Sequence, residues 1–369
     1  MTLYLSLQRN HENTLKRGIM KYVKLGSSDL QVSEVCLGSM TWGSQNTQQQ
    51  AFDQIDYALE QGVNFIDTAE LYAVPPKKET YGLTEQYIGH WLAQNPAKRK
   101  DIILASKIAG PGLSWIRQGG KITGKAVKEA LDQSLTNLQT DYLDLYQLHW
   151  PNRANPHFCR HWPGTINYAE IDATRETEEH LEILSALSDC VQSGKIRHCG
   201  LSDDTPWGIN QYLRLAEQYN LPRMVSIQNE FNLLHLMDSP HLIETCVLND
   251  VAYLPWSPIA GGALSGKYRL GALPAGCRWT LEQRNGIFRD TSQSHAAIEA
   301  YYEVAQRNGL SLTQMSLAWV YQFTGVTSTI IGATSVEQLK EDLGAYQLVL
   351  LDDVLQQINQ VIKRFPVPF

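Results

Sequence analysis

The sequence predicts an α/β fold: a (β/α)8 TIM barrel with an N-terminal β-hairpin and extra C-terminal helices. Short apolar runs alternate with segments of helical period in eight β-then-α units over about 300 residues, as in a closed parallel barrel. An open doubly wound sheet, the main competing fold, usually carries a G-x-G-x-x-G turn after an early strand. The chain has neither that turn nor a P-loop. No linker divides it, so residues 20–369 are expected to form a single barrel domain.

The strands are predicted from apolar runs that end in glycine or polar residues. They are expected at residues 32–40, 63–67, 101–107, 141–150, 196–202, 224–229, 251–258 and 327–332. The first helix, residues 47–62, places Phe52, Ile55 and Ala58 on one face and ends at a glycine. Thr84 is the expected N-cap of the second helix. The later helices are expected at residues 84–95, 123–139, 178–193, 206–219, 240–249, 293–308, 311–323, 335–344 and 352–363.

The segment before the first barrel strand reads as a small hairpin. "YVKLGSSDLQVSEV" has a turn at residues 26–28 and could cover the barrel floor, because the first barrel strand is expected to begin near Val32. Residues 1–19 are expected to be a disordered N-terminal tail. Their apolar patch is brief and is followed by Arg9 and Glu12, which does not fit a signal peptide.

Composition and charge exclude several classes of function. The net charge is −7 and no stretch is densely basic, which argues against nucleic acid as the main partner. No apolar run approaches the roughly 20 residues of a membrane helix. The six cysteines contain no Cys-x-x-Cys pair and are expected to be free thiols in a reducing compartment, the cytoplasm.

One cluster has side chains that metals prefer. "HFCRH" contains His157, Cys159 and His161, but no fourth ligand is spaced beside them. No metal site is therefore predicted.

Several expected strands end in residues that can carry chemistry. In a TIM barrel the carboxyl ends of the strands form one mouth, where catalysis occurs. The second strand ends at Asp67 with Tyr72 just beyond, the third at Lys107 and the fourth at His149. The next three strands end in Ser202 and Asp203, in Gln228 and Asn229, and in Trp256 and Ser257.

The four ionisable groups fit one reaction. A lysine cation lowers the pKa of a tyrosine, and a carboxylate keeps the lysine protonated. His149 can hydrogen-bond the same oxygen that Tyr72 protonates, so the group would polarise a carbonyl and deliver a proton to it. The hydride would have to come from a nicotinamide cofactor. Each residue alone also has a structural reading: a Lys107–Asp67 salt bridge, a core histidine, or a loop tyrosine.

A family resemblance follows from seven motifs in order. "FIDTAELY", "ASK", "DYLDLYQLHW", "GLSDD", "IQNEFNLL", "PWSPIAGGALSGKY" and "IIGATSVEQLKEDL" resemble those of aldo-keto reductases, from about residue 22 to residue 361. "YAVPPKKETYGLTEQYIGHWL" is similar to the bacterial Tas-like branch, whose members are NADP(H)-dependent reductases. The resemblance implies Tyr72 as general acid, Lys107 as its activating cation, Asp67 as the lysine's partner and His149 as the group that orients the carbonyl.

The resemblance also implies a cofactor site, across the barrel mouth and without a Rossmann turn. The residues beside the nicotinamide ribose would be Gly38, Ser39, Met40 and Thr41, and those at its carboxamide Ser202, Asp203 and Gln228. Trp256 would stack on the nicotinamide. The pyrophosphate loop would comprise Ser257, Pro258, Ile259, Gly261, Leu264 and Lys267. The adenosine end would comprise Gly332, Thr334, Gln338 and Asp342.

Two positions, Asp203 and Asp342, depart from the family pattern. Asp203 replaces an asparagine that donates to the carboxamide; an ionised aspartate only accepts, so it would bind the carboxamide NH2 or stay protonated. Trp256 stands where the family usually has a tyrosine or another aromatic residue. Asp342 replaces a frequent asparagine and would repel a 2′-phosphate. Arg284 and Arg289 are candidates for gripping that phosphate, unless they are solvated surface arginines.

The sequence thus predicts an NADP(H)-dependent oxidoreductase that reduces a small-molecule aldehyde or ketone. The alternative is a non-catalytic, cofactor-binding regulatory subunit of the same fold, the role that potassium-channel β-subunits take. A metal-dependent barrel hydrolase or isomerase would need two or three ligands at strand ends, and only Asp67 and His149 qualify. Residues 151–177, with Trp162 and Tyr168, are expected to shape the substrate pocket. Trp42 and Trp150 are expected to line it and to favour apolar or aromatic carbonyls.

Overall fold

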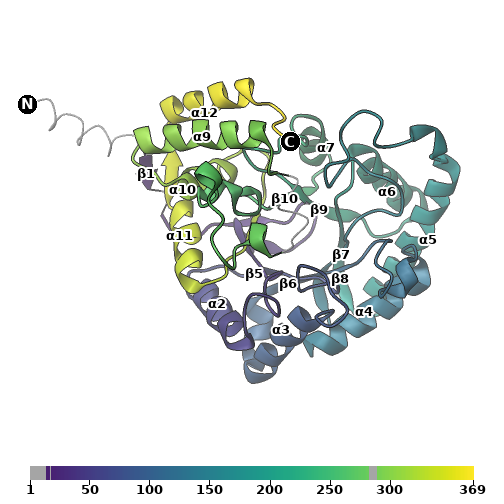
Figure 1. Ribbon diagram of the computed structural model, residues 1–369. Coiled ribbons are helices and arrows are strands. Elements are labelled where there is room, and N and C mark those ends of the chain that lie inside the picture. The colour runs from purple at the N-terminus through teal and green to yellow at the C-terminus, as the bar shows by residue number, and fades with distance from the viewer. Residues whose placement is uncertain (1–13, 17, 282–288) are drawn as a thin grey trace, which may run out of the picture.

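The computed structural model describes residues 14–16, 18–281 and 289–369. Eight parallel strands form a nearly closed barrel inside a ring of helices (Figure 1). In chain order these strands are β4 (Val35–Gly38), β5 (Phe65–Asp67), β6 (Ile103–Ile108), β7 (Leu143–Leu148), β8 (Ile196–Ser202), β9 (Met224–Glu230), β10 (Ala252–Trp256) and β11 (Thr329–Ile331). Each pairs with the next along the chain up to β10, and β11 returns to pair with β4. The predicted TIM barrel is confirmed.

The seam of the barrel lies between β10 and β11. There the N–H of Thr327 donates to the carbonyl of Tyr253 at 2.9 Å. The N–H of Tyr253 donates to Thr327 Oγ1 at 3.1 Å. These contacts join the two sides of the barrel where the ladder of strand pairs is interrupted.

The helices cover the outside of the strands. They are α2 (Gln48–Glu60), α3 (Leu83–Gln94), α4 (Gly124–Leu138), α5 (Ala173–Gln192), α6 (Pro206–Tyr219), α7 (His241–Leu248), α9 (Ser292–Arg307), α10 (Leu312–Tyr321), α11 (Val336–Tyr346) and α12 (Asp352–Arg364). The predicted extra C-terminal helix is α12, which lies beside α9 at the top of Figure 1. In the described part of the chain, none of the helices combines the length and hydrophobicity needed to cross a membrane.

Two helix starts differ from the prediction. Thr84 is not the N-cap of α3: Gly82 is, and Thr84 lies inside the helix, where its hydroxyl donates to the carbonyl of Trp42 at 2.6 Å. α5 begins at Ala173 rather than at residue 178. Asp172 caps it by accepting from two backbone N–H groups of the first turn. A side-chain cap thus sets the start of α5, whereas α3 begins after a glycine in the left-handed conformation.

The predicted first strand is divided between two sheets. Its beginning belongs to β3 (Gln31–Ser33), which pairs antiparallel with β2 (Tyr22–Lys24) as the predicted hairpin. Only the part from Val35 enters the barrel. Within the range predicted as a tail, Thr14–Lys16 form strand β1, which pairs antiparallel with β12 (Leu348–Leu350), a pairing the sequence did not predict. Residues 1–13 and 17 lie outside the described residues.

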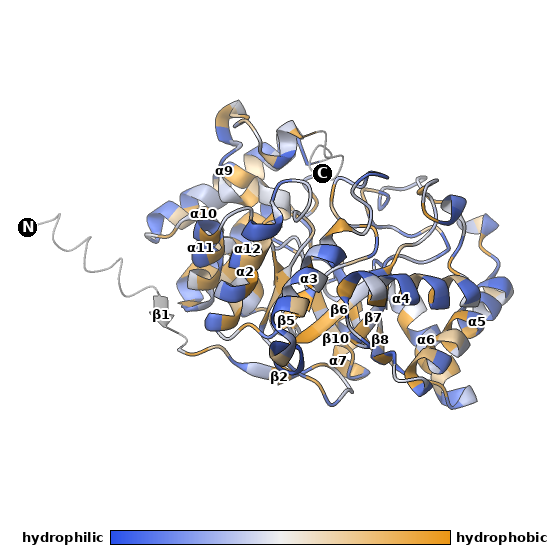
Figure 2. Cartoon of the chain, turned by 90° about the horizontal axis from the view of Figure 1, so that it is seen from below, coloured by the Kyte–Doolittle hydropathy of each residue, from blue (hydrophilic) through white to orange (hydrophobic). Residues whose placement is uncertain are grey.

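The hairpin closes the floor of the barrel. Its buried side chains Leu25, Leu30 and Val32 form one apolar cluster with interior residues of the strands, among them Phe65 and Leu145. In Figure 2, β2 lies at the end of the barrel opposite the C-terminus of the chain. The open end of the barrel is therefore the end where the carboxyl ends of the strands meet.

The turn of this hairpin tolerates only glycine. Gly26 has φ +54°, and a Cβ there would lie 2.2 Å from the carbonyl oxygen of Val225. Gly26→Ala is expected to lower the free energy of unfolding by about 3 kcal/mol, because strain and a backbone clash add together. Gly194→Ala is the matched control: φ is +74° there but nothing lies within 4 Å, so about 1 kcal/mol is expected. Urea unfolding measures both, and equal losses would contradict the close contact.

Candidate active site

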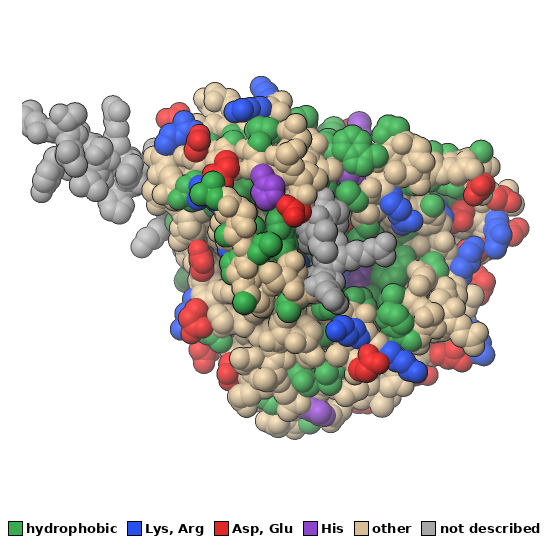
Figure 3. All heavy atoms as spheres, in the orientation of Figure 1, with side chains coloured by type: hydrophobic (Ala, Val, Ile, Leu, Met, Phe, Trp, Pro, Cys, Tyr) green, Lys and Arg blue, Asp and Glu red, His purple; other side chains and the backbone are tan. Residues whose placement is uncertain are grey.

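A cavity of about 730 Å³ opens at the carboxyl ends of the barrel strands. On the face seen in Figure 3, hydrophobic side chains gather near the centre, and most charged side chains lie toward the periphery. The cavity is lined by most of the predicted site residues: Gly38, Ser39, Met40, Thr41, Asp67, Tyr72, His149, Ser202, Asp203, Gln228, Trp256, Ser257, Pro258, Ile259, Gly261, Lys267, Gly332, Thr334, Gln338 and Asp342. These residues come from most of the barrel strands and their loops. A single cavity therefore contains both predicted catalytic residues and predicted cofactor-binding residues.

Lys107 does not itself line the cavity; its ammonium group lies buried behind Asp67 and Tyr72, which do. Its Nζ donates to Asp67 Oδ2 at 2.6 Å, to the carbonyl of Thr68 at 2.9 Å and to the hydroxyl of Tyr72 at 3.4 Å. The exposed fraction is 0% for Lys107, 2% for Asp67 and 9% for Tyr72. Burial alone would lower the pKa of Lys107, but the neighbouring carboxylate outweighs burial and raises it. Lys107 is therefore a cation, held by three oxygen atoms.

The second oxygen of Asp67 accepts two more hydrogen bonds. Gln147 Nε2 donates to Oδ1 at 3.1 Å, and Gln228 Nε2 donates to it at 2.9 Å. A buried carboxylate needs such partners on both oxygens. The partners come from β6, β7 and β9, so the sheet orients this carboxylate from three strands. The side-chain N–H of Gln228, predicted to hold a carboxamide, is occupied by Asp67.

His149 lies beside the tyrosine rather than beside the lysine. The rings of Tyr72 and His149 are 5.7 Å apart, edge to face, and the ring of Trp150 lies 5.0 Å from His149 on its other side. Burial, followed by the charge of Lys107, lowers the pKa of His149 well below its ordinary value. The imidazole is therefore neutral at pH 7. Its Nδ1 is buried without a hydrogen-bond partner among the described residues.

The pKa of Tyr72 differs from the expectation. Burial raises it, while the neighbouring Lys107 cation acts in the opposite direction and does not offset burial. Lys107 thus lowers the pKa of Tyr72 as expected, but the desolvation of a phenolate outweighs this effect, so the phenol is not more acidic than an ordinary one. Tyr72 carries its proton at neutral pH.

Glu70, which lies between Asp67 and Tyr72 in the chain, does not face the cavity. Arg117 grips its carboxylate with two N–H groups at 2.7 and 2.9 Å, and Tyr81 donates to it at 2.9 Å. These contacts fix the loop that follows β5. Of the polar residues at this strand end, Asp67 and Tyr72 line the cavity and Glu70 holds their loop in place.

The loop after β10 makes a tight turn along the cavity wall. Ser257, Ala260, Gly261 and Gly262 have φ of 55°, 51°, 63° and 95°, and the N–H of Gly261 donates to Ser257 Oγ at 2.8 Å. Leu264, predicted as part of the cofactor site, does not line the cavity. Its side chain is buried in the hydrophobic core, because the turn directs it away.

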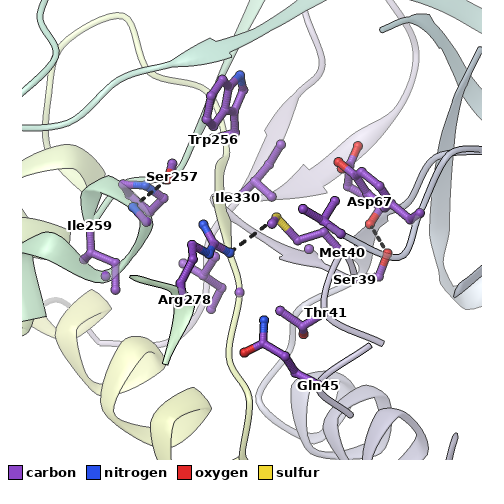
Figure 4. A pocket seen from close by; sticks show the side chains of 18 of the residues that line it. Ser39, Met40, Thr41, Gln45, Asp67, Trp256, Ser257, Ile259, Arg278 and Ile330 are labelled. Carbon is purple, nitrogen blue, oxygen red and sulfur yellow. Dashed lines mark hydrogen bonds between the residues drawn. The ribbon is translucent and has the colours of Figure 1, made fainter. Parts of the chain in front are cut away.

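Three cationic side chains line the cavity near this loop: Lys267, Arg278 and Arg289. Arg278, which the sequence analysis missed, reaches across the cavity and donates to Met40 Sδ at 3.6 Å (Figure 4). Burial, followed by the charge of Arg289, lowers its pKa to about 10. In the described residues no carboxylate lies within ion-pair distance of Arg278. Arg278 lies in an irregular loop, so its positive charge was the one feature of the sequence that could have indicated a role in binding an anion.

The two predicted phosphate-binding arginines have different outcomes. Arg289 is not a solvated surface arginine: it is 1% exposed, lines the cavity and forms an ion pair with Glu230. Arg284 lies outside the described residues. At the far end of the cavity, Gln338 Oε1 accepts from the N–H and the hydroxyl of Thr334, both at 3.0 Å. Burial there raises the pKa of Asp342 to about 8.

Some expected pocket residues lie elsewhere. Trp42 is fully buried outside the cavity, and its indole N–H donates to Gln54 Oε1 at 3.1 Å. Trp162 and Tyr168 are 48% and 70% exposed and do not line it. From the same irregular loop, Phe158 and Arg160 do line it, as does the predicted Trp150. The apolar part of the lining also includes Leu71, Val74, Pro111 and Leu113.

The His-Cys-His segment is held by backbone contacts. His157 Nε2 lies 3.1 Å from the carbonyl of Asp204, and His161 Nε2 lies 3.1 Å from the carbonyl of Phe369. Over the described ranges, no group of three or more histidine, cysteine, aspartate or glutamate side chains has the arrangement of a metal site. These imidazoles anchor the loop.

Comparisons with known proteins agree with this architecture. The sequence model of the Aldo/keto reductase family matches residues 34–363. Protein tas of Escherichia coli is 42% identical over 354 residues, which cover 95% of this chain and 100% of that protein. Uncharacterized oxidoreductase YrpG of Bacillus subtilis is 29% identical over 353 residues, 95% of this chain and 97% of YrpG. An Arabidopsis thaliana protein named Probable voltage-gated potassium channel subunit beta is 27% identical over 359 residues, 94% and 98% of the two chains.

The buried ion pair gives a stability prediction. Lys107→Met or Asp67→Asn alone leaves one charge without its partner, so each is expected to lower the free energy of unfolding by about 3–5 kcal/mol. The double variant Asp67→Asn/Lys107→Met is expected to lose less than the sum, because neither charge remains. Urea unfolding measures all three.

A solvent-exposed pair supplies the control. Lys195 and Asp132 lie 2.6 Å apart, with exposed side-chain fractions of 42% and 56%. Lys195→Met should leave the free energy of unfolding nearly unchanged, since water solvates both partners. Strictly additive losses at Asp67 and Lys107 would contradict a coupled pair.

Proposed function

The chain belongs to the aldo/keto reductase family of oxidoreductases, and we propose that it reduces an aldehyde or a ketone to an alcohol with NADPH. The observation that carries this proposal is the cluster of Asp67, Lys107 and Tyr72 beside His149, facing one large cavity. A purely structural Lys107–Asp67 salt bridge would not need a phenol at 3.4 Å that also lines the cavity. A phenol placed in this way can act as a general acid toward a ligand in the cavity.

The residues along the cavity fit the cofactor NADP(H). In the same cavity as Tyr72 and His149, Ser202 Oγ is buried without a hydrogen-bond partner in the described residues, and Trp256 offers a flat ring. Farther along, the left-handed turn at Gly261 and Gly262 leaves room for close approach of phosphate oxygens. The cations of Lys267 and Arg278 lie beside that turn. A neutral ring site at one end and a cationic wall at the other match the charge distribution of such a cofactor.

We assign the steps to the chain's own residues. Asp67 keeps Lys107 charged, and Lys107 in turn stabilises the negative charge that Tyr72 acquires when its proton leaves. The neutral His149 can donate a hydrogen bond to the substrate carbonyl oxygen and hold it within reach of the Tyr72 hydroxyl. Tyr72 then protonates the carbonyl oxygen, which gains negative charge as the hydride adds to the carbonyl carbon. The bound nicotinamide would supply the hydride to the carbonyl carbon.

The shape of the cavity near Tyr72 supports apolar or aromatic carbonyls as substrates. Leu71, Val74, Trp150 and Phe158 line this part of the cavity and supply hydrophobic contact area. A small hydrophilic aldehyde would leave this surface exposed to water. Bulky aldehydes should therefore have the higher kcat/KM.

The Tyr72 hydroxyl can be removed without changing the size of the ring. Tyr72→Phe is expected to lower kcat by at least about 100-fold, since general acids contribute that much or more. The Kd for NADPH should stay within about twofold. Turnover is measured as the loss of NADPH absorbance with a panel of aldehydes, and Kd by calorimetry.

Tyr22→Phe is the matched control, because its hydroxyl donates to the carbonyl of Gly62 away from the cavity and its loss should leave turnover largely intact. An equal loss of NADPH binding in Tyr72→Phe would mean that Tyr72 has a structural role. No turnover by the wild type with any aldehyde, despite tight NADPH binding, would favour the regulatory alternative. The similarity to the Arabidopsis protein named as a channel subunit is the reason to test this alternative.

Asp342 gives a pH prediction. Its pKa of about 8 keeps the carboxyl neutral at pH 7, so it does not repel a 2′-phosphate there. As the pH rises through 8 the carboxylate forms, and the Kd for NADPH is expected to rise about threefold to tenfold by pH 9. Asp342→Asn should abolish this rise. NADH, which lacks the 2′-phosphate, should show little pH dependence in either protein, and a rise that persists in Asp342→Asn would contradict the assignment.

A further inference from the structure

Asp203, which departs from the family pattern, and Trp256 touch each other in the wall of the cavity. Trp256, at the end of β10, donates its indole N–H to Asp203 Oδ1 at 3.2 Å. Both residues line the cavity; Asp203 follows β8 and Trp256 ends β10, the strands on either side of β9. A tyrosine at 256 has no N–H at its ring edge, so this contact depends on the tryptophan.

The Asp203 carboxyl is held in one place. Asp203 is 2% exposed, has φ of 48° and donates its backbone N–H to the carbonyl of Gln228 at 3.0 Å. Its side chain therefore starts from a fixed, left-handed backbone, which aspartate tolerates better than most residues. The oxygen that meets the indole is part of a rigid wall, not of a mobile side chain.

Among the described residues, the one basic side chain within ion-pair distance of Asp203 is that of His157. His157 Nδ1 lies 3.7 Å from Oδ1, but burial lowers the pKa of His157 to about 4, so the imidazole is neutral at pH 7. Burial also raises the pKa of Asp203 well above its ordinary value, and Glu230 and Asp238 act in the same direction. A neutral carboxyl has one carbonyl acceptor and one O–H donor, as the amide of asparagine has an acceptor and a donor.

The indole is held at its face as well as at its edge. Phe158 stacks on Trp256 with ring centroids 6.0 Å apart and an interplanar angle of 26°. The turn that presents Phe158 is anchored by His157, whose Nε2 bonds to the Asp204 carbonyl. Stacking alone allows an aromatic ring to slide and rotate in its plane, whereas a hydrogen bond at the edge fixes that rotation.

We propose that Asp203 is a positioning residue that acts through Trp256: its carboxyl holds the indole in the orientation on which the nicotinamide ring stacks. The inference rests on the proposed function, since it needs the nicotinamide at this end of the cavity. It differs from the role of an asparagine at this position, which would bind the carboxamide directly. Asp203 and Trp256 then act together as one functional unit.

A double-mutant cycle tests whether Asp203 acts through the indole. In the wild-type background, Asp203→Ala is expected to raise the Kd for NADPH about fivefold, the effect of losing one hydrogen bond of ordinary strength. In the Trp256→Phe background, the same change should raise Kd less than twofold, because no indole N–H remains to be held. Calorimetry measures Kd without turnover.

Two further measurements separate positioning from a merely structural role. Asp203→Asn keeps an acceptor and should restore the wild-type Kd, with thermal unfolding showing that all variants are folded. The near-UV circular dichroism signal of Trp256 is the spectrum of the wild type minus that of Trp256→Phe. This signal should be lost in the spectrum of Asp203→Ala and kept in the spectrum of Asp203→Asn. A variant that only loosened the fold would not follow this order.

The outcomes are distinct. A fivefold loss in both backgrounds would overturn the proposal and would mean that Asp203 binds the cofactor directly. No loss in either background would also overturn it. If the wild type binds NADPH but reduces no aldehyde, the reductase function fails while the cycle still reports on Asp203 and Trp256. If the wild type does not bind NADPH at all, both fail.

Discussion

The buried ion pair between Lys107 and Asp67 constrains the whole mouth of the barrel. Removing both charges from water is costly, so each needs partners in addition to the other. The Thr68 carbonyl takes one N–H of the lysine, and the amides of Gln147 and Gln228 donate to the free oxygen of Asp67. These partners come from different strands. The pair is therefore possible only once the sheet has closed around it.

The same pair divides the cavity into two electrostatic regions. Near Tyr72 the charges of Lys107 and Asp67 balance each other, His149 is neutral and the surrounding side chains are apolar. Toward the loop after β10 the balance is broken, because Arg278 has only a thioether as its hydrogen-bond partner in the described residues. A ligand that is neutral at one end and anionic at the other gains from both regions.

Much of this arrangement could be predicted from the sequence because it depends on local patterns. The bounds of β8 and α6 agree with the prediction, since strong periodicity and polar or proline ends define both. The pairing of β1 with β12 could not be predicted, because its partners are more than 300 residues apart and neither strand has a distinctive pattern. In the irregular loops, residue type does not tell which way a side chain points. Leu264 and Trp42 therefore turned out to be core residues, and Arg278 was missed.

The pairing of Asp203 with Trp256 has a physical cause. An indole placed at a buried wall adds an N–H group that must find an acceptor, or the wall carries an unsatisfied donor. An asparagine could accept with its carbonyl oxygen, but its NH2 group would then need acceptors of its own in the same place. A protonated aspartate has a single donor hydrogen and therefore needs fewer acceptors around it than an asparagine does. The tryptophan thus favours an acceptor beside it, and burial raises the pKa of Asp203 well above its ordinary value although the hydrogen bond from Trp256 acts in the opposite direction.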